Sequence, residues 1–127
     1  MIYNLFIREG VNLEEIVYSL KDVKKIFKSS SEITHALDGI TFDIKKGEIV
    51  VILGPSGSGK STMLNVLSGI DIPTSGQILY NNVRIDKMND KELTDYRKEN
   101  LGFIFQSYNL IPNLTIYENV ELGSHLS

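Results

Sequence analysis

Residues 54–62 carry the pattern G-x-x-x-x-G-K-[ST], and in full they read Gly54-Pro55-Ser56-Gly57-Ser58-Gly59-Lys60-Ser61-Thr62. The pattern suits a phosphate group, because glycines allow the positive φ angles that turn several backbone N–H groups toward one anion. A helix that begins at the end of the run would add the partial positive charge of its N-terminus. Lys60 would supply a full charge to the β- and γ-phosphates, and the Ser61 hydroxyl would bind Mg²⁺. The nine residues are therefore predicted to form a phosphate-binding loop.

The sequence on either side of this loop supports the prediction. A short β-branched run at 49–53 is typical of a buried strand, and apolar residues at 63, 64, 66 and 67 indicate a helix that ends at Gly69. The alternative is a glycine–serine turn with an incidental lysine. For this composition the pattern arises by chance in about one such sequence in a hundred. Because a strand precedes the loop and a helix follows it, as the motif requires, we favour the phosphate site.

Upstream of the loop, the pattern predicts two strands with a loop between them. Residues 17–23 form the first expected strand, and residues 40–44 alternate between apolar and polar side chains as a half-buried strand does. Residues 24–32, which are rich in lysine and serine, are expected to be the loop. Residues 48–53 then predict a strand that is buried on both faces, as in a parallel sheet.

Downstream of the loop, turn residues and cap residues divide the chain. A hairpin is expected from residues 77–80 and 83–85 across Asn81-Asn82. Asn89 with Glu92, and residue 115 with residue 118, have the spacing of capping boxes, which predicts helices from 89 to about 99 and from 115 through 120. Residues 101–105 are expected to be a short apolar strand, and residues 107–113 a loop.

The composition excludes several classes of function. The chain has 13 basic and 16 acidic residues, a net charge of −3 and a pI near 5.3, which argues against a nucleic-acid binder with a broad basic surface. It has no cysteine, so disulfides and thiolate chemistry are excluded and a cytosolic compartment fits. No stretch approaches the ~20 apolar residues that span a bilayer, so a role at the membrane would need a partner.

Four further stretches carry a resemblance to a known family. They read Leu37-Asp38-Gly39-Ile40, Lys46-Gly47-Glu48-Ile49, Leu67-Ser68-Gly69-Ile70-Asp71-Ile72-Pro73-Thr74-Ser75-Gly76-Gln77-Ile78 and Gly102-Phe103-Ile104-Phe105-Gln106. With the phosphate loop they resemble the nucleotide-binding domain of ABC transporters, over about residues 17–122. The last stretch resembles the Q-loop of that family. Residues 109–120 resemble the branch that includes macrolide-export, lipoprotein-release and antimicrobial-peptide-export ATPases.

The resemblance implies an α/β fold of the ABC type of P-loop NTPase, in which an antiparallel β segment lies beside a parallel core sheet. Residues 1–15 would be an N-terminal extension, and residues 16–127 the N-terminal half of the ATP-binding domain, from the Walker A loop through the Q-loop. The resemblance also implies that Phe27 stacks on the adenine and that Gln106 binds Mg²⁺ with Ser61 and couples the site to the membrane subunit. Without the resemblance, Phe27 is better explained as a core aromatic at the end of a strand, and Gln106 as an ordinary loop residue.

After Gln106 the chain shows no LSGGQ-type signature, no Walker B strand ending in Asp-Glu and no switch histidine. His35, in an expected polar loop, and His125, near the end, do not match that histidine and are expected to be solvated. The resemblance therefore implies a truncated domain without its catalytic base. We expect such a chain to be inactive in ATP hydrolysis by itself, although Lys60 and Gln106 contribute to the site.

As a complete domain, the resemblance implies an ATP hydrolase, the ATP-binding subunit of an ABC transporter, which uses ATP and Mg²⁺ to drive export or extrusion of a substrate. The implied partners are a transmembrane permease subunit and a second ATP-binding domain, and no nucleic acid. The implied location is cytoplasmic, peripheral on the inner face of the cell membrane through the permease. Two alternatives stay open. An ABC-type ATPase without transport would lack a transmembrane partner, and a non-hydrolysing remnant would not turn over Mg-ATP.

Overall fold

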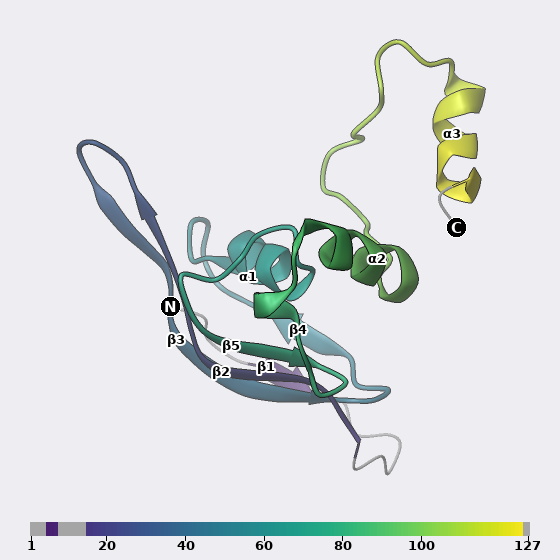
Figure 1. Cartoon of the computed structure of the whole chain (residues 1–127). Helices are drawn as coiled ribbons and strands as arrows, with labels where there is room; N and C mark the ends of the chain where they lie inside the picture. The colour runs from purple at the N-terminus through teal and green to yellow at the C-terminus, as the bar shows by residue number, and fades with distance from the viewer. Residues whose placement is uncertain (1–4, 8–14, 126–127) are drawn as a thin grey trace.

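Figure 1 shows the computed structural model of the chain, which describes residues 5–7 and 15–125. In chain order the elements are β1 (Leu5–Ile7), β2 (Ile16–Lys28), β3 (Ile33–Lys45), β4 (Val50–Ile52), α1 (Lys60–Leu67), β5 (Ser75–Tyr80), β6 (Val83–Arg84), the short 3₁₀ helix η1 (Ile85–Lys87), α2 (Asp90–Asn100) and α3 (Ile116–His125). Of the predicted N-terminal extension, β1 and Glu15 are described, and the rest lies outside the described residues. Within the described ranges, none of the helices has the length and apolar character that crossing a membrane requires.

The strands form two separate sheets. Four of them lie in the order β3-β2-β5-β6, and β1 pairs with β4. Every strand pair among the described residues is antiparallel, so the predicted parallel core sheet is not formed within them. The expectation that the strand before the phosphate loop is buried on both faces is wrong for the described residues, since Val51 in β4 is 42% exposed. Burial of that kind needs a strand on each side and cover over both faces, and in the described part of the chain β4 pairs with β1 alone.

The long hairpin of β2 and β3 replaces most of the loop predicted at 24–32. β2 continues to Lys28 and pairs with β3, so the turn is confined to residues 29–32, where the Ser29 N–H donates to the Glu32 carbonyl at 2.9 Å. Polar residues are tolerated in this part of β2 because their backbone groups pair with β3. The side chains of Phe27 and Lys28 at its end face solvent. The tip of the hairpin projects from the rest of the molecule (Figure 1).

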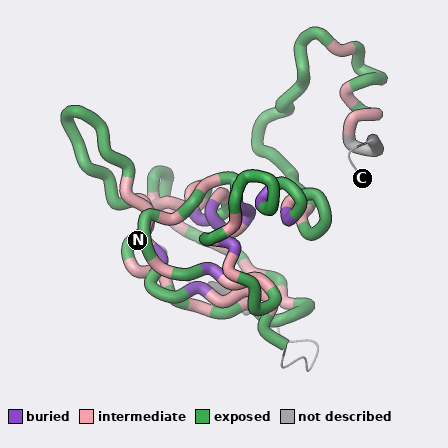
Figure 2. Tube along the Cα trace, in the orientation of Figure 1, coloured by how far each residue is buried: buried purple, intermediate pink, exposed green. Residues whose placement is uncertain are grey.

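The core lies between the four-stranded sheet and the helices α1 and α2, where the buried positions gather (Figure 2). The fully buried side chains come from β2, β3, α1 and β5, and they are Leu20, Val23, Leu37, Met63, Val66 and Ile78. Burying an apolar side chain of this size contributes roughly 1.5–3 kcal/mol. These contacts hold α1 against the sheet, and therefore also hold the loop that leads into α1.

The predicted helix after the phosphate loop and the predicted hairpin are both confirmed. α1 ends at Leu67, two residues before Gly69. β5 and β6 are joined by Asn81 and Asn82, whose φ angles of 47° and 66° are the left-handed pair that a two-residue hairpin turn requires.

Both predicted capping boxes are present. At the start of α2, Asn89 Oδ1 accepts from the Glu92 N–H at 3.0 Å, and the Glu92 carboxylate accepts from the Asn89 N–H at 2.8 Å. At the start of α3, the Glu118 carboxylate accepts from the Thr115 N–H at 2.7 Å, and the Thr115 hydroxyl accepts from the Glu118 N–H at 3.2 Å. The hydrogen bonds from Thr115 lower the pKa of the exposed Glu118 carboxyl group. α3 continues to His125, beyond the predicted end at residue 120.

The segment that follows α2 departs from the prediction. Residues 101–105 form no strand, and Ile104 in their midst is fully exposed. A strand needs a neighbour for its backbone N–H and C=O groups, and this segment pairs with none of the strands in the described part of the chain. It runs instead as an irregular connection to α3, which stands apart from the core (Figure 1).

Candidate functional site

A pocket of about 560 Å³ lies where the phosphate loop meets the β2–β3 hairpin, near the turn of the hairpin. Its lining comes from β2, β3, the phosphate loop, the first turn of α1 and the segment after α2, and consists of Phe27, Thr34, Ala36, Ser56, Gly57, Gly59, Lys60, Ser61, Thr62 and Gln106. The pocket thus brings together three parts of the sequence that were singled out separately: the phosphate loop, Phe27 and Gln106. Of the nine predicted loop residues, Gly54, Pro55 and Ser58 do not line it.

Two glycines give the phosphate loop its shape. Gly57 and Gly59 have φ angles of 78° and 91°, in the left-handed region that other residues enter at a cost. At Gly59 a Cβ atom would stand 2.2 Å from the carbonyl oxygen of Ala36 in β3. Glycine at this position therefore lets the loop approach β3 closely, which brings the two walls of the pocket together.

The start of α1 is suited to an anion. Gly59 is its N-cap, no side chain caps its free N–H groups, and its first turn contains no acidic residue. The unpaired N–H groups and the helix dipole leave a partial positive charge at this end. The hydroxyl-bearing residues Ser61 and Thr62 lie in the same turn and line the pocket.

Lys60 adds a full charge beside this helix end. Its Nζ donates to the carbonyl oxygens of Gly54 at 2.9 Å and Pro55 at 2.7 Å, which fold the side chain back along the loop. An ammonium group has three donors, so these two bonds leave one for a further acceptor in the pocket.

The residues present fit a bound phosphate with Mg²⁺. Ser61 and Gln106 offer the neutral oxygen atoms that Mg²⁺ accepts as ligands. No group of three His, Cys, Asp or Glu residues in the described ranges could hold a metal ion alone. Any Mg²⁺ at this site would therefore depend on phosphate oxygens and water for the rest of its coordination.

Phe27 lies at the rim of the pocket, and its exposed fraction is 47%. That exposure does not fit the alternative of an ordinary core aromatic. An exposed ring at the edge of a phosphate-binding pocket offers a flat apolar face on which a base can stack.

Sequence reasoning missed two of the lining residues, Thr34 and Ala36. Both lie on β3, and Thr34 is the cross-strand partner of Phe27. The lysine-rich composition concealed the end of β2, and the register that places Thr34 opposite Phe27 is a tertiary property. His35 stands between them on β3, not in a loop, and is exposed as predicted. The side chain of His125 lies outside the described part of the chain.

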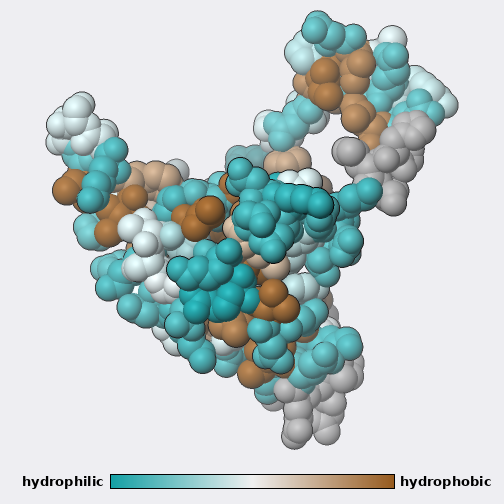
Figure 3. Space-filling view, viewed as in Figure 1, coloured by the Kyte–Doolittle hydropathy of each residue, from teal (hydrophilic) through white to brown (hydrophobic). Residues whose placement is uncertain are grey.

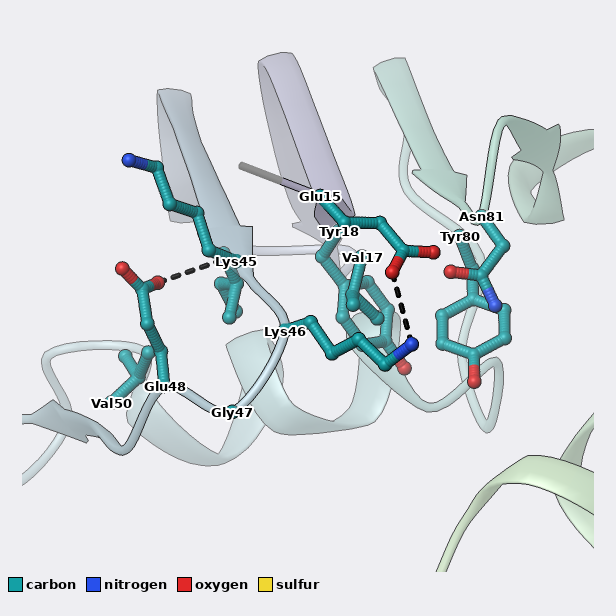
Figure 4. Close-up of a pocket in the computed structure, with 11 residues that line it drawn as sticks. Glu15, Val17, Tyr18, Lys45, Lys46, Gly47, Glu48, Val50, Tyr80 and Asn81 are labelled. Carbon is teal, nitrogen blue, oxygen red and sulfur yellow. Dashed lines mark hydrogen bonds and ion pairs between the residues drawn. The ribbon is translucent and has the colours of Figure 1, made fainter. Parts of the chain in front are cut away.

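A second pocket of about 480 Å³ lies at the opposite end of β2 and β3 (Figure 4). Here Lys46 Nζ lies 3.0 Å from a carboxylate oxygen of Glu15, and the Glu48 carboxylate accepts from the Lys45 N–H at 2.7 Å. The side chains of Lys46 and Glu15 are each 59% exposed, and an ion pair of that kind contributes about 0–1 kcal/mol. The charges at this pocket are those of a solvated strand end.

Comparison with known proteins relates the chain to one family. Residues 37–126 match the protein family described as ABC transporter. The ABC transporter ATP-binding protein MJ0796 of Methanocaldococcus jannaschii is 50% identical over 103 residues, which make up 81% of this chain and 44% of that protein. The macrolide export ATP-binding/permease protein MacB of Brucella abortus is 47% identical over 103 residues, 81% of this chain and 16% of that protein.

The fold also matches a solved structure. The ATP-binding cassette MJ0796, seen as a dimer in a post-hydrolysis state with bound ADP and Pi, superimposes with a TM-score of 0.77 at 50% identity. The match covers 83% of this chain and 45% of that one. The chain therefore spans less than half the length of the relatives it matches.

Proposed function

Since this chain belongs to the ABC transporter family, we propose that it forms the Walker A to Q-loop part of an ATP-binding subunit that couples ATP binding and hydrolysis to export or extrusion of a substrate. The relative MacB, named as a macrolide export protein with ATP-binding and permease parts, supports this direction of transport. The bound ADP and Pi of the MJ0796 cassette support a nucleotide as the ligand.

The pocket that joins Phe27, the phosphate loop and Gln106 is the observation that carries the proposal. The N–H groups of the loop and of the first turn of α1 would hold the phosphates, and Lys60 would turn its remaining donor toward them. The exposed face of Phe27 would hold the base. Ser61 and Gln106 would hold Mg²⁺, which when bound lowers the charge on the β- and γ-phosphates.

The partners follow from the same relatives. The MJ0796 cassette is dimeric, so we propose that a second ATP-binding domain faces this one. MacB unites an ATP-binding part with a permease, so we propose a transmembrane permease as the other partner, with this subunit bound to it at the inner face of the cell membrane.

The proposal is tested by nucleotide binding and hydrolysis in the full-length protein. A contact between an ammonium and a phosphate contributes roughly 1.5–3 kcal/mol, so Lys60→Ala should weaken Mg-ATP binding about ten- to a hundredfold and abolish turnover. Lys46→Ala, which removes an exposed lysine at the other pocket, is the matched control and should change neither quantity. Calorimetric titration and phosphate release measure the two effects. Equal ATP affinity and turnover in Lys60→Ala and the parent would refute the proposal.

A further inference from the structure

Lys25 on β2 is held more firmly than the other lysines in ion pairs. Its Nζ lies 2.6 Å from Asp71 Oδ1 and 2.8 Å from the Ile72 carbonyl oxygen. Its side chain is 14% exposed, whereas the neighbouring Lys24 is 38% exposed and lies 3.9 Å from its acidic partner. The Lys25 ammonium therefore has a fixed position against the loop that follows α1.

The backbone around Lys25 is tied to the same loop. The Thr74 N–H donates to the Lys24 carbonyl at 2.8 Å, and the Ile26 N–H donates to the Thr74 hydroxyl at 2.9 Å. Residues 24–26 of β2 are thus fastened to residues 71–74 on both sides of the lysine. α1 connects that loop to the phosphate loop. The C-terminal end of β2 is therefore positioned relative to the phosphate site.

Phe27 is the next residue on the same face of the strand as Lys25. The Lys25 Nζ lies 5.2 Å from the centre of the Phe27 ring, within the ~6 Å range of a cation–π contact. A half-exposed ring at the end of a hairpin would otherwise sample several rotamers and lose that freedom when a ligand stacks on it. The ammonium favours one ring orientation before any ligand arrives.

We propose that Lys25, anchored by Asp71, is a positioning residue that holds the Phe27 ring ready to stack on the base of the nucleotide. The inference rests on the proposed function and adds a residue to it. Lys25 does not line the pocket, so it acts through the ring and not by touching the ligand. Its effect should therefore depend on the presence of a base and on the presence of Phe27.

The test compares Mg-ATP with magnesium tripolyphosphate, which has the phosphates without the base, by calorimetric titration of the full-length protein. Lys25→Met should weaken ATP binding about two- to fivefold, the range of an exposed cation–π contact, and leave tripolyphosphate binding unchanged. Lys25→Arg keeps a cation that can pair with Asp71 and stack on the ring, so it should retain the parent affinity for ATP. Lys24→Met is the matched control and should bind both ligands as the parent does.

A double variant separates positioning from general stability. In a Phe27→Ala background, adding Lys25→Met should cause no further loss of ATP affinity. If Lys25→Met does not fold, Asp71→Asn, which releases the lysine from its anchor, should show the same loss for ATP alone. An equal loss for ATP and tripolyphosphate, or a loss that persists without Phe27, would overturn the inference. Parent-like ATP binding by Lys25→Met would overturn this inference and leave the proposed function standing. A parent protein that binds neither ligand would overturn both.

Discussion

Gly59 is a residue at which the phosphate loop lies against β3, and its replacement has two separable effects. Gly59→Ala combines a φ of 91° with a Cβ 2.2 Å from the Ala36 carbonyl oxygen. At Gly57 the φ is 78°, but a Cβ atom added there would have no neighbouring atom within 4 Å. The left-handed backbone costs a residue with a side chain roughly 1–2 kcal/mol, so Gly57→Ala should lose about that much stability and Gly59→Ala clearly more.

Thermal unfolding midpoints of the full-length protein, with ATP titrations beside them, check this order. Lys91→Ala, at an exposed position on α2 away from the phosphate loop, is the control, and its midpoint should equal that of the parent. A Gly59→Ala variant with parent stability and affinity would mean that the loop does not pack on β3 as described.

Gln106 is placed by a loop, and its predicted role concerns turnover more than binding. It lines the pocket from the segment after α2, together with residues of the first turn of α1. If its amide oxygen contributes to Mg²⁺ binding in the reacting state, Gln106→Ala should lower kcat for ATP while KM changes little. Gln77→Ala, an exposed glutamine on β5, is the matched control. Unaltered kcat in Gln106→Ala would count against the metal role.

The parts of the site differ in how far the sequence predicts them, for a physical reason. The phosphate loop is contiguous, so one local pattern identifies all nine residues. Phe27 and Gln106 are remote from it in the chain, and only the resemblance to a family singled them out. Thr34 and Ala36 reach the pocket through the pairing of β2 with β3, and a pairing register is a tertiary property that no local pattern encodes.

Among the elements, the helix starts were predicted well because their signals are local. The capping box of α2 uses two side chains and two backbone groups within four residues. Asn89→Ala should remove the bond to the Glu92 N–H and destabilise α2 by about 1 kcal/mol. Amide hydrogen exchange in the first turn of α2 measures this. Lys91→Ala keeps its backbone N–H and should leave the exchange rates as they are, whereas equal rates in Asn89→Ala and the parent would exclude the cap.

The strand predictions were less accurate because a strand is completed by its neighbours. Residues 101–105 have the apolar composition of a strand, yet they have no partner in the described part of the chain and remain irregular. Residues 24–28 have a polar composition, yet β3 pairs with them and they form part of β2. In both cases the availability of backbone partners outweighed the propensity of the side chains.

At the scale of the whole molecule, large apolar side chains are exposed on α3 and on the connection that leads to it. Figure 3 shows hydrophobic side chains gathered around α3, and the connection to it also carries exposed apolar side chains, such as Ile104 and Leu110. The largest exposed fractions in these segments belong to Ile104, Tyr108, Ile116, Tyr117 and Val120. The match to MJ0796 covers 45% of that cassette, so a complete cassette has residues available to cover such a surface.

Residues 1–127 produced alone are therefore expected to be poorly soluble or loosely ordered, and to show negligible Mg-ATP hydrolysis. Exposed apolar segments and unpaired strand edges favour aggregation over a stable monomer, and no glutamate follows an apolar strand in this sequence to act as the catalytic base. Thermal unfolding measures how well the chain is ordered, binding of a hydrophobic dye measures its exposed apolar surface, and phosphate release measures ATP hydrolysis. The full-length protein is the reference. That reference should unfold cooperatively, bind little dye and hydrolyse ATP. A cooperative transition in residues 1–127 with turnover near that of the reference would show that the exposed surface needs no further cover and that the catalytic base lies within this chain.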